Sequence, residues 1–198
     1  NEILIRLRTN DGIEGFGLAT SYTTAEPILQ VFRSGLAKRI IGANPLAPER
    51  IYEDLFSLTS TRVAHEKGWG REALVRVSAA VDVACWDIIG KIAGLPLYQL
   101  FGGYRDKVPY YVTCAYYRDG KDLTELRDEI TELKEQGHQG FKAKVGGMEL
   151  PDDLKRLEVV RDVIGDSCSL MIDVNRAWNL DTATEAARAL VSLNPLWL

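Results

Sequence analysis

The sequence predicts an α/β fold in which an α+β segment precedes a parallel sheet made of repeated strand-helix units. Alternating apolar residues on both sides of Asn10-Asp11-Gly12 predict a β-hairpin at the start of the chain. A long stretch with helical periodicity follows and ends at Gly94 and Pro96. After residue 103, strand and helix patterns alternate at intervals of about 30 residues, which is the size of one βα unit.

The first part of the chain is expected to hold the hairpin and three helices. The hairpin strands are expected at residues 3–8 and 13–17, and the helices at 26–40, 48–58 and 71–92. The last helix has the strongest pattern, since Val77, Val81, Ala84 and Ile88 recur at helical spacing. Residues 59–70 contain two glycines and are expected to form a mobile loop.

The second part is expected to contain three βα units and the beginning of a fourth strand. The expected strands are 108–117, 140–147, 169–175 and 196–198, and the expected helices are 122–136, 151–164 and 181–193. Asp152 and Asp153 fit the first turn of a helix, where acidic groups complement the helix dipole. No GxGxxG motif follows the first strand, which favours a (β/α)8 barrel over an open nucleotide-binding sheet.

Polar residues occupy one face of two successive strands. Side chains alternate between the two faces of a strand, and the apolar positions suited to the covering helices are Phe141, Ala143, Val145, Leu170, Ile172 and Val174. The alternation therefore puts Lys142, Lys144, Asp173 and Asn175 on the opposite face. Active sites of barrel enzymes are built at the carboxyl ends of the strands, so these four residues are predicted to form a functional site.

Each of these residues has a simpler interpretation when it is considered alone. A lysine pair in a strand usually marks a solvent-exposed face, and an aspartate after a strand is more often a turn or helix cap than a metal ligand. The presence of polar pairs at the same end of neighbouring strands favours the functional interpretation. Gly146-Gly147 could hold an anion, although a turn at the end of the strand is the simpler interpretation.

The composition argues against several classes of protein. The 198 residues include 24 basic and 28 acidic side chains, for a net charge of −4, and no basic cluster indicates a nucleic-acid partner. Cys85, Cys114 and Cys168 are odd in number and form no CxxC pair, which fits a reducing cytoplasm better than a disulfide framework. No apolar run approaches the roughly 20 residues that a membrane span needs, and no leader pattern opens the chain.

The motifs resemble those of one enzyme superfamily. FKAKVG at 141–146, followed by MIDVN at 171–175, closely resembles the KxK and DxN motifs of the enolase superfamily, in its mandelate racemase and muconate lactonizing branches. DGIEGFG at 11–17 resembles the capping domain of that family, and AVDVACWDIIGK at 80–91 resembles the helix before its barrel. The resemblance implies an α+β capping domain at 1–105 that lacks its first strand. Residues 106–198 would then begin a (β/α)8 TIM-type barrel, truncated after about three βα units.

The resemblance also implies a metal-dependent reaction at these residues. Removing the proton next to a substrate carboxylate gives an enediolate with nearly two negative charges, which Mg²⁺ would stabilise. Asp173 would be a metal ligand and Lys144 the catalytic base. A free lysine titrates near about 10.4, and a base at neutral pH needs a pKa roughly 2 to 3 lower. The charge of Lys142, with partial burial and the metal, is expected to lower the pKa of Lys144.

Further site residues follow from the same resemblance, and the expected partners follow from the resemblance together with the composition. Lys142 would also be catalytic and bind substrate, and Asn175, Tyr22 and Trp69 would be substrate-binding residues. The expected partner is a small-molecule carboxylate, with no nucleic acid and no membrane, and the protein is expected to be a homo-oligomer. The remaining metal ligands are expected beyond Leu198, so this segment alone is expected to be inactive.

The expected activity of the full-length protein is that of an acid-sugar dehydratase. Alternatives within the superfamily are a racemase or epimerase and a cycloisomerase, because the same enediolate leads to all of these products. A noncatalytic barrel protein and a phosphate-binding barrel enzyme of another family are the remaining alternatives.

Overall fold

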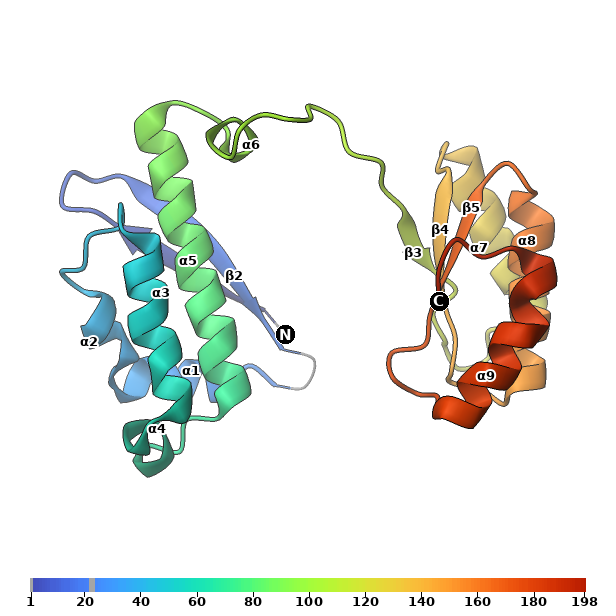
Figure 1. The fold of residues 1–198 in the computed structure, drawn as a ribbon, viewed down its shortest axis with the longest axis horizontal. Coiled ribbons are helices and arrows are strands. Elements are labelled where there is room, and N and C mark those ends of the chain that lie inside the picture. Colours follow the sequence, from blue (N-terminus) through green and yellow to red (C-terminus); the bar gives the residue numbers. More distant parts are fainter. Residues whose placement is uncertain (1, 22–23) are drawn as a thin grey trace. The chain divides into compact units, whose positions relative to one another are not determined.

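The computed structural model describes residues 2–21 and 24–198 of the chain (Figure 1). It divides into two compact units, Asn1–Asp106 and Lys107–Leu198. The first combines a two-stranded antiparallel sheet with helices, and the second contains a three-stranded parallel sheet with its helices. These features confirm the predicted α/β fold class. Within the described residues, no helix has the length and apolar character needed to cross a membrane.

The first unit is a β-hairpin packed on a long helix. β1 (Glu2–Arg8) pairs antiparallel with β2 (Glu14–Thr20), as predicted. α5 (Arg71–Ala93) packs along the hairpin, and α3 (Pro48–Ser57) lies beside α5 (Figure 1). The core that these elements enclose includes Ile5, Leu36, Leu55, Leu74, Val77 and Val81.

Two glycines allow β2 to lie directly against α5. A Cβ atom at Gly17 would be 1.8 Å from the carbonyl oxygen of Ala80, and one at Gly15 would be 2.1 Å from that of Ala84. Neither position can accept a side chain without separating the strand from the helix. Backbone contact between β2 and α5 therefore holds the unit together at these two points.

The segments around α3 differ from the predictions. The helix expected at 26–40 is divided into α1 (Glu26–Val31), a π-helical turn (Phe32–Leu36) and α2 (Ala37–Ile40), because Gly35 has a φ of 120° that no helix accommodates.

The prediction of a loop at residues 59–70 is also wrong in part. A 3-10 turn (Leu58–Ser60) and α4 (Arg62–Glu66) occupy most of it, and burial of Ala64 and Trp69 in the core anchors the segment. α6 (Leu97–Leu100) follows α5.

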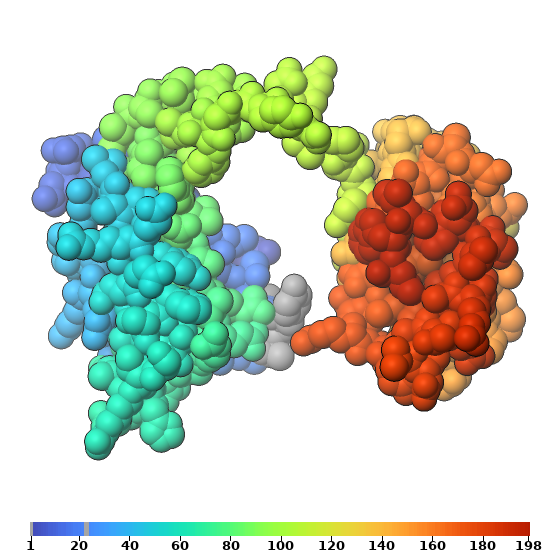
Figure 2. Space-filling view, viewed as in Figure 1, coloured from blue at the N-terminus to red at the C-terminus, as the bar shows by residue number. Residues whose placement is uncertain are grey.

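The second unit contains the parallel strands β3, β4 and β5 in that order. Its elements are β3 (Val112–Cys114), α7 (Leu123–Glu135), β4 (Gly140–Lys144), α8 (Leu150–Ile164), β5 (Ser169–Asp173), α9 (Leu180–Ala189) and a 3-10 turn (Leu190–Leu193). β3 is much shorter than the strand expected at 108–117. Instead of the fourth strand, a single parallel bridge joins Trp197 to Met171, and the end of the chain, dark red in Figure 2, lies on this unit.

The two faces of the parallel sheet differ as the alternation predicts. Phe141, Ala143, Leu170 and Ile172 are fully buried in one core with residues of α7 and α8. Lys142, Lys144 and Asp173 alternate with them and are only partly buried. The helices therefore cover one face of the sheet, and the predicted site lies on the other.

Asp122 caps the N-terminus of α7, and its removal is expected to destabilise the second unit. Its Oδ1 accepts hydrogen bonds from the N–H groups of Thr124 (2.8 Å) and Glu125 (2.9 Å). We expect Asp122→Ala to lower the free energy of unfolding by about 1 kcal/mol in a urea titration. Asp128→Ala, at an exposed position within α7, is the control and should cause no loss. Equal losses in both variants would contradict the capping role.

Candidate active site

Lys142, Lys144 and Asp173 meet at the carboxyl ends of β4 and β5. The parallel register pairs Lys144 with Asp173. Asp173 Oδ2 lies 2.7 Å from Lys142 Nζ and 2.6 Å from Lys144 Nζ. The exposed fractions of the three side chains are 19%, 13% and 22% for Lys142, Lys144 and Asp173. The strand alternation thus brings three charged groups together in a partly desolvated cluster.

Asn175 completes this polar group from the turn after β5. Its Oδ1 accepts a hydrogen bond from Lys144 Nζ at 3.2 Å, and its N–H donates to Asp173 Oδ1 at 3.0 Å. Its φ of 46° lies in the left-handed region, which asparagine tolerates better than most residues. All four residues predicted from the strand alternation are therefore joined in one network through Asp173.

The shared carboxylate sets the electrostatics of the cluster. Hydrogen bonds from Lys142 and then Lys144, with the N–H of Asn175, hold the pKa of Asp173 well below its usual range. The hydrogen bond to Asp173 raises the pKa of Lys142 above its ordinary value. The sequence argument considered only repulsion between the two lysines, whereas in the structure Asp173 compensates both charges. Lys142 is therefore a stable cation.

Asp173 has the chemistry of a magnesium ligand. Its carboxylate is ionised, and hard cations such as Mg²⁺ prefer oxygen ligands of this kind. Over residues 2–21 and 24–198, no three or more His, Cys, Asp or Glu side chains are grouped so that they could hold a metal ion. Asp173 therefore fits the ion as one ligand of a set.

Aromatic rings surround the two lysines, and they are not among the residues predicted from the sequence. Lys142 Nζ lies 5.7 Å from the ring centroid of Tyr111 and 5.9 Å from that of Trp197. Lys144 Nζ lies 5.8 Å from the ring centroid of Tyr116. Such cation–π contacts stabilise an ammonium group by about 0.5–1 kcal/mol at exposed sites. The sequence signal that could have identified Tyr111 and Tyr116 is the concentration of tyrosines around β3.

Trp69 is one of the two substrate-binding residues expected in the first part of the chain, and it is buried. Trp69 is only 6% exposed and belongs to the core of the first unit. Its Nε1 donates a hydrogen bond to Ser34 Oγ at 2.5 Å, and Lys67 Nζ lies 5.2 Å from its ring centroid. This buried position differs from the loop position expected for it. Tyr22 lies outside the described residues.

The amides of Gly146 and Gly147 are bonded within the protein. Gly146 N–H donates to Asp153 Oδ2 at 2.7 Å, and Gly147 N–H donates to the hydroxyl of Tyr117 at 3.0 Å. These bonds favour the interpretation of Gly146-Gly147 as a turn at the end of β4 over an anion-binding loop.

Both units match known protein families. Residues 1–102 match the N-terminal domain of mandelate racemase / muconate lactonizing enzyme, and residues 125–198 match the enolase C-terminal domain-like family. Arabinonate dehydratase of Saccharolobus solfataricus is 29% identical over 196 residues, covering 98% of this chain and 50% of that protein. N-succinyl-L-Arg/Lys racemase of Bacillus cereus is 32% identical over 203 residues, covering 99% of this chain and 50% of that protein.

Solved structures agree with these matches. The crystal structure of a racemase from Streptomyces coelicolor with bound magnesium has a TM-score of 0.85 and 31% identity, covering 99% of this chain and 57% of that one. Other similar proteins include cycloisomerases and epimerases. The chain spans about half the length of the curated relatives it matches.

Proposed function

This chain belongs to the mandelate racemase and muconate lactonizing enzyme family of the enolase superfamily, and from this membership we propose that the full-length protein abstracts the proton next to a substrate carboxylate. The observation that carries the proposal is the contact of Lys144 with Asp173 at the carboxyl ends of two adjacent parallel strands. Barrel enzymes assemble their active sites at this end of the sheet.

Each residue of the cluster would have a separate role in the reaction. Lys144 would accept the α-proton at its Nζ. Lys142 would bind the carboxylate of the substrate, since a lysine ammonium group is cationic at neutral pH. Asn175 would hold the substrate or orient Lys144 through its amide. Asp173 would be a ligand of Mg²⁺, which when bound supplies a Lewis acid that stabilises the negative charge of the enediolate.

We further propose that the reaction is the dehydration of an acid sugar. In such a reaction the enediolate expels the hydroxyl group of the β-carbon, which leaves as water together with a proton equivalent to the one taken from the α-carbon, and the resulting enol becomes a keto acid. The similarity to arabinonate dehydratase over 98% of this chain supports this choice. Racemisation is the second candidate, supported by the similarity to N-succinyl-L-Arg/Lys racemase.

Product analysis distinguishes the two candidates. The full-length protein would be incubated with Mg²⁺ and a panel of acid sugars and N-acylated amino acids, with a metal-chelated sample as the control. A dehydratase forms a keto acid that lacks one molecule of water, which NMR and mass spectrometry detect. Formation of epimers alone would contradict the dehydratase proposal.

A further inference from the structure

We propose that Tyr117, Asp153 and Arg156 form a clamp that fixes the carboxyl ends of β3 and β4 and thereby positions Lys144. The inference rests on the proposed role of Lys144 as the base. None of the three clamp residues contacts the cluster of Lys142, Asp173 and Asn175 through its side chain in the interactions described above, so the clamp acts through the backbone.

Asp153 is the centre of the clamp. It lies in the first turn of α8, and its side chain is fully buried. Oδ2 accepts the N–H of Gly146 at 2.7 Å, while Oδ1 accepts the hydroxyl of Tyr117 and Arg156 Nη1, the latter at 3.1 Å. The hydroxyl of Tyr117 in turn accepts the N–H of Gly147. Every partner of this carboxylate therefore belongs to α8 or to the segments that follow β3 and β4.

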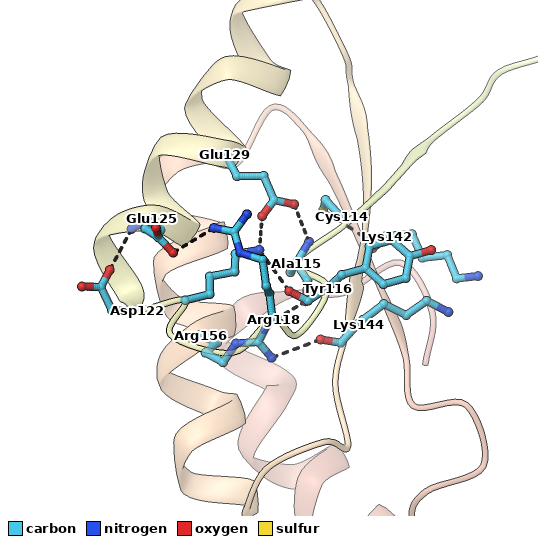
Figure 3. Close-up of polar contacts among 11 residues, drawn as sticks. Cys114, Ala115, Tyr116, Arg118, Asp122, Glu125, Glu129, Lys142, Lys144 and Arg156 are labelled. Atoms are coloured by element: carbon cyan, nitrogen blue, oxygen red, sulfur yellow. Dashed lines mark hydrogen bonds and ion pairs between the residues drawn. The ribbon is translucent and has the colours of Figure 1, made fainter.

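Arg156 links the ends of the two strands. Its guanidinium donates to the carbonyl oxygen of Ala115 at 2.6 Å and to that of Lys144 at 3.4 Å. It also lies 3.9 Å from the ring centroid of Tyr117. Figure 3 shows Arg156 reaching these carbonyls from the side of the helices, while the ammonium groups of Lys142 and Lys144 extend to the other side.

The backbone at the end of β3 is held in an unfavourable conformation by the same contacts. Ala115 has a φ of 58°, in the left-handed region that costs free energy for a residue with a side chain. Its N–H donates to Glu129 Oε1 at 2.9 Å, and Arg156 binds its carbonyl oxygen. Side chains on two helices thus impose a turn that the sequence does not favour locally.

The buried ion pair of Asp153 and Arg156 contributes more to the geometry of the site than to the stability of the fold. Desolvation offsets most of the attraction between buried charges, and apolar residues of similar volume often stabilise a fold as well. What Asp153 and Arg156 provide is a fixed position for the Lys144 carbonyl, from which the side chain extends to Asp173. A misplacement of about 1 Å at a reacting group can lower a rate by roughly 100-fold.

The test compares three variants of the full-length protein. Arg156→Lys removes the fork that joins two carbonyls, and Tyr117→Phe removes one hydroxyl while the buried ion pair remains. Arg161→Lys is the matched control, because Arg161 also lies on α8 and donates to the carbonyls of Gly165, Cys168 and Leu193.

We expect kcat to fall about 10- to 100-fold in Arg156→Lys and about tenfold in Tyr117→Phe, with KM nearly unchanged. The deuterium isotope effect on kcat should rise in both, and the control should keep the wild-type kcat.

Crystal structures of the same variants give a readout that does not depend on activity. In Arg156→Lys and Tyr117→Phe we expect Lys144 Nζ to move out of hydrogen-bond range of Asp173, beyond about 3.5 Å. An unmoved Lys144, or a lower melting temperature with wild-type kcat, would overturn the proposal. Absence of α-proton exchange in the wild-type protein would overturn the proposed function instead. The position of Lys144 Nζ in the crystal structures of the variants would then still test the clamp. If Arg156→Lys does not fold, kcat and the position of Lys144 in Tyr117→Phe test the proposal.

Discussion

Replacing Lys144 by methionine is expected to lower kcat of the full-length protein by about 100- to 10,000-fold, the range typical for loss of a general base. Methionine keeps much of the volume of the side chain but cannot accept a proton. The proposed binding of substrate by Lys142 should persist, so KM should change little. Steady-state kinetics with the best substrate of the panel measure both constants.

Lys155→Met is the matched control for this experiment. Lys155 lies on the exposed side of α8 and forms an ion pair with Asp152 at 2.8 Å. The same change of charge and shape there should leave kcat at the wild-type value. A Lys144→Met enzyme that keeps more than about one tenth of the wild-type kcat would exclude Lys144 as the base.

Gly17→Ala is expected to cause the largest loss of stability, about 3 kcal/mol, at the upper end of the usual cost of overpacking. The added methyl group would meet the carbonyl oxygen of Ala80 at 1.8 Å, and this atom belongs to the backbone of α5 and cannot rotate away. The hairpin must therefore separate from α5. Urea unfolding of the purified chain measures the change.

Gly70→Ala provides the comparison for Gly17→Ala. Gly70 has a φ of −66°, and nothing lies within 4 Å of a Cβ atom built there. Because Gly70 is the N-cap of α5, where alanine is less favourable than glycine, this variant should lose no more than about 1 kcal/mol. Similar midpoints for the two variants would show that β2 does not lie against α5 as described.

The regular elements of the fold follow from local sequence patterns. The hairpin, α5 and the βα units were predictable because each has an apolar period that matches its secondary structure. The two-residue period of the strands was also sufficient to place Lys142, Lys144, Asp173 and Asn175 on one face.

The failed prediction of a loop at residues 59–70 depends on tertiary contacts. Helix α4 lies in a segment where packing overrides the local pattern, since Ala64 and Trp69 are drawn into the core, whereas the break before α2 follows from the positive φ of Gly35.

The surroundings of the site could not be derived in the same way. Asp153 has the sequence position of an ordinary first-turn acid, and only the fold shows that it bonds Tyr117 and the N–H of Gly146. The same holds for Trp197, whose ring reaches Lys142 from the end of the chain. These contacts join residues that are distant in sequence, and no periodicity encodes them.

We propose that Lys144 and Asp173 form a metal-assisted site for proton abstraction, and hydrogen exchange tests this role most directly. The full-length protein would be incubated in ²H₂O with Mg²⁺ and the acid-sugar panel, and NMR would follow deuterium at the carbon next to the carboxylate. We predict incorporation into substrate or product with the wild-type protein, and a loss of at least about 100-fold in Lys144→Met and Asp173→Asn. Undiminished exchange in either variant, or no exchange with any carboxylate tested, would contradict the claim.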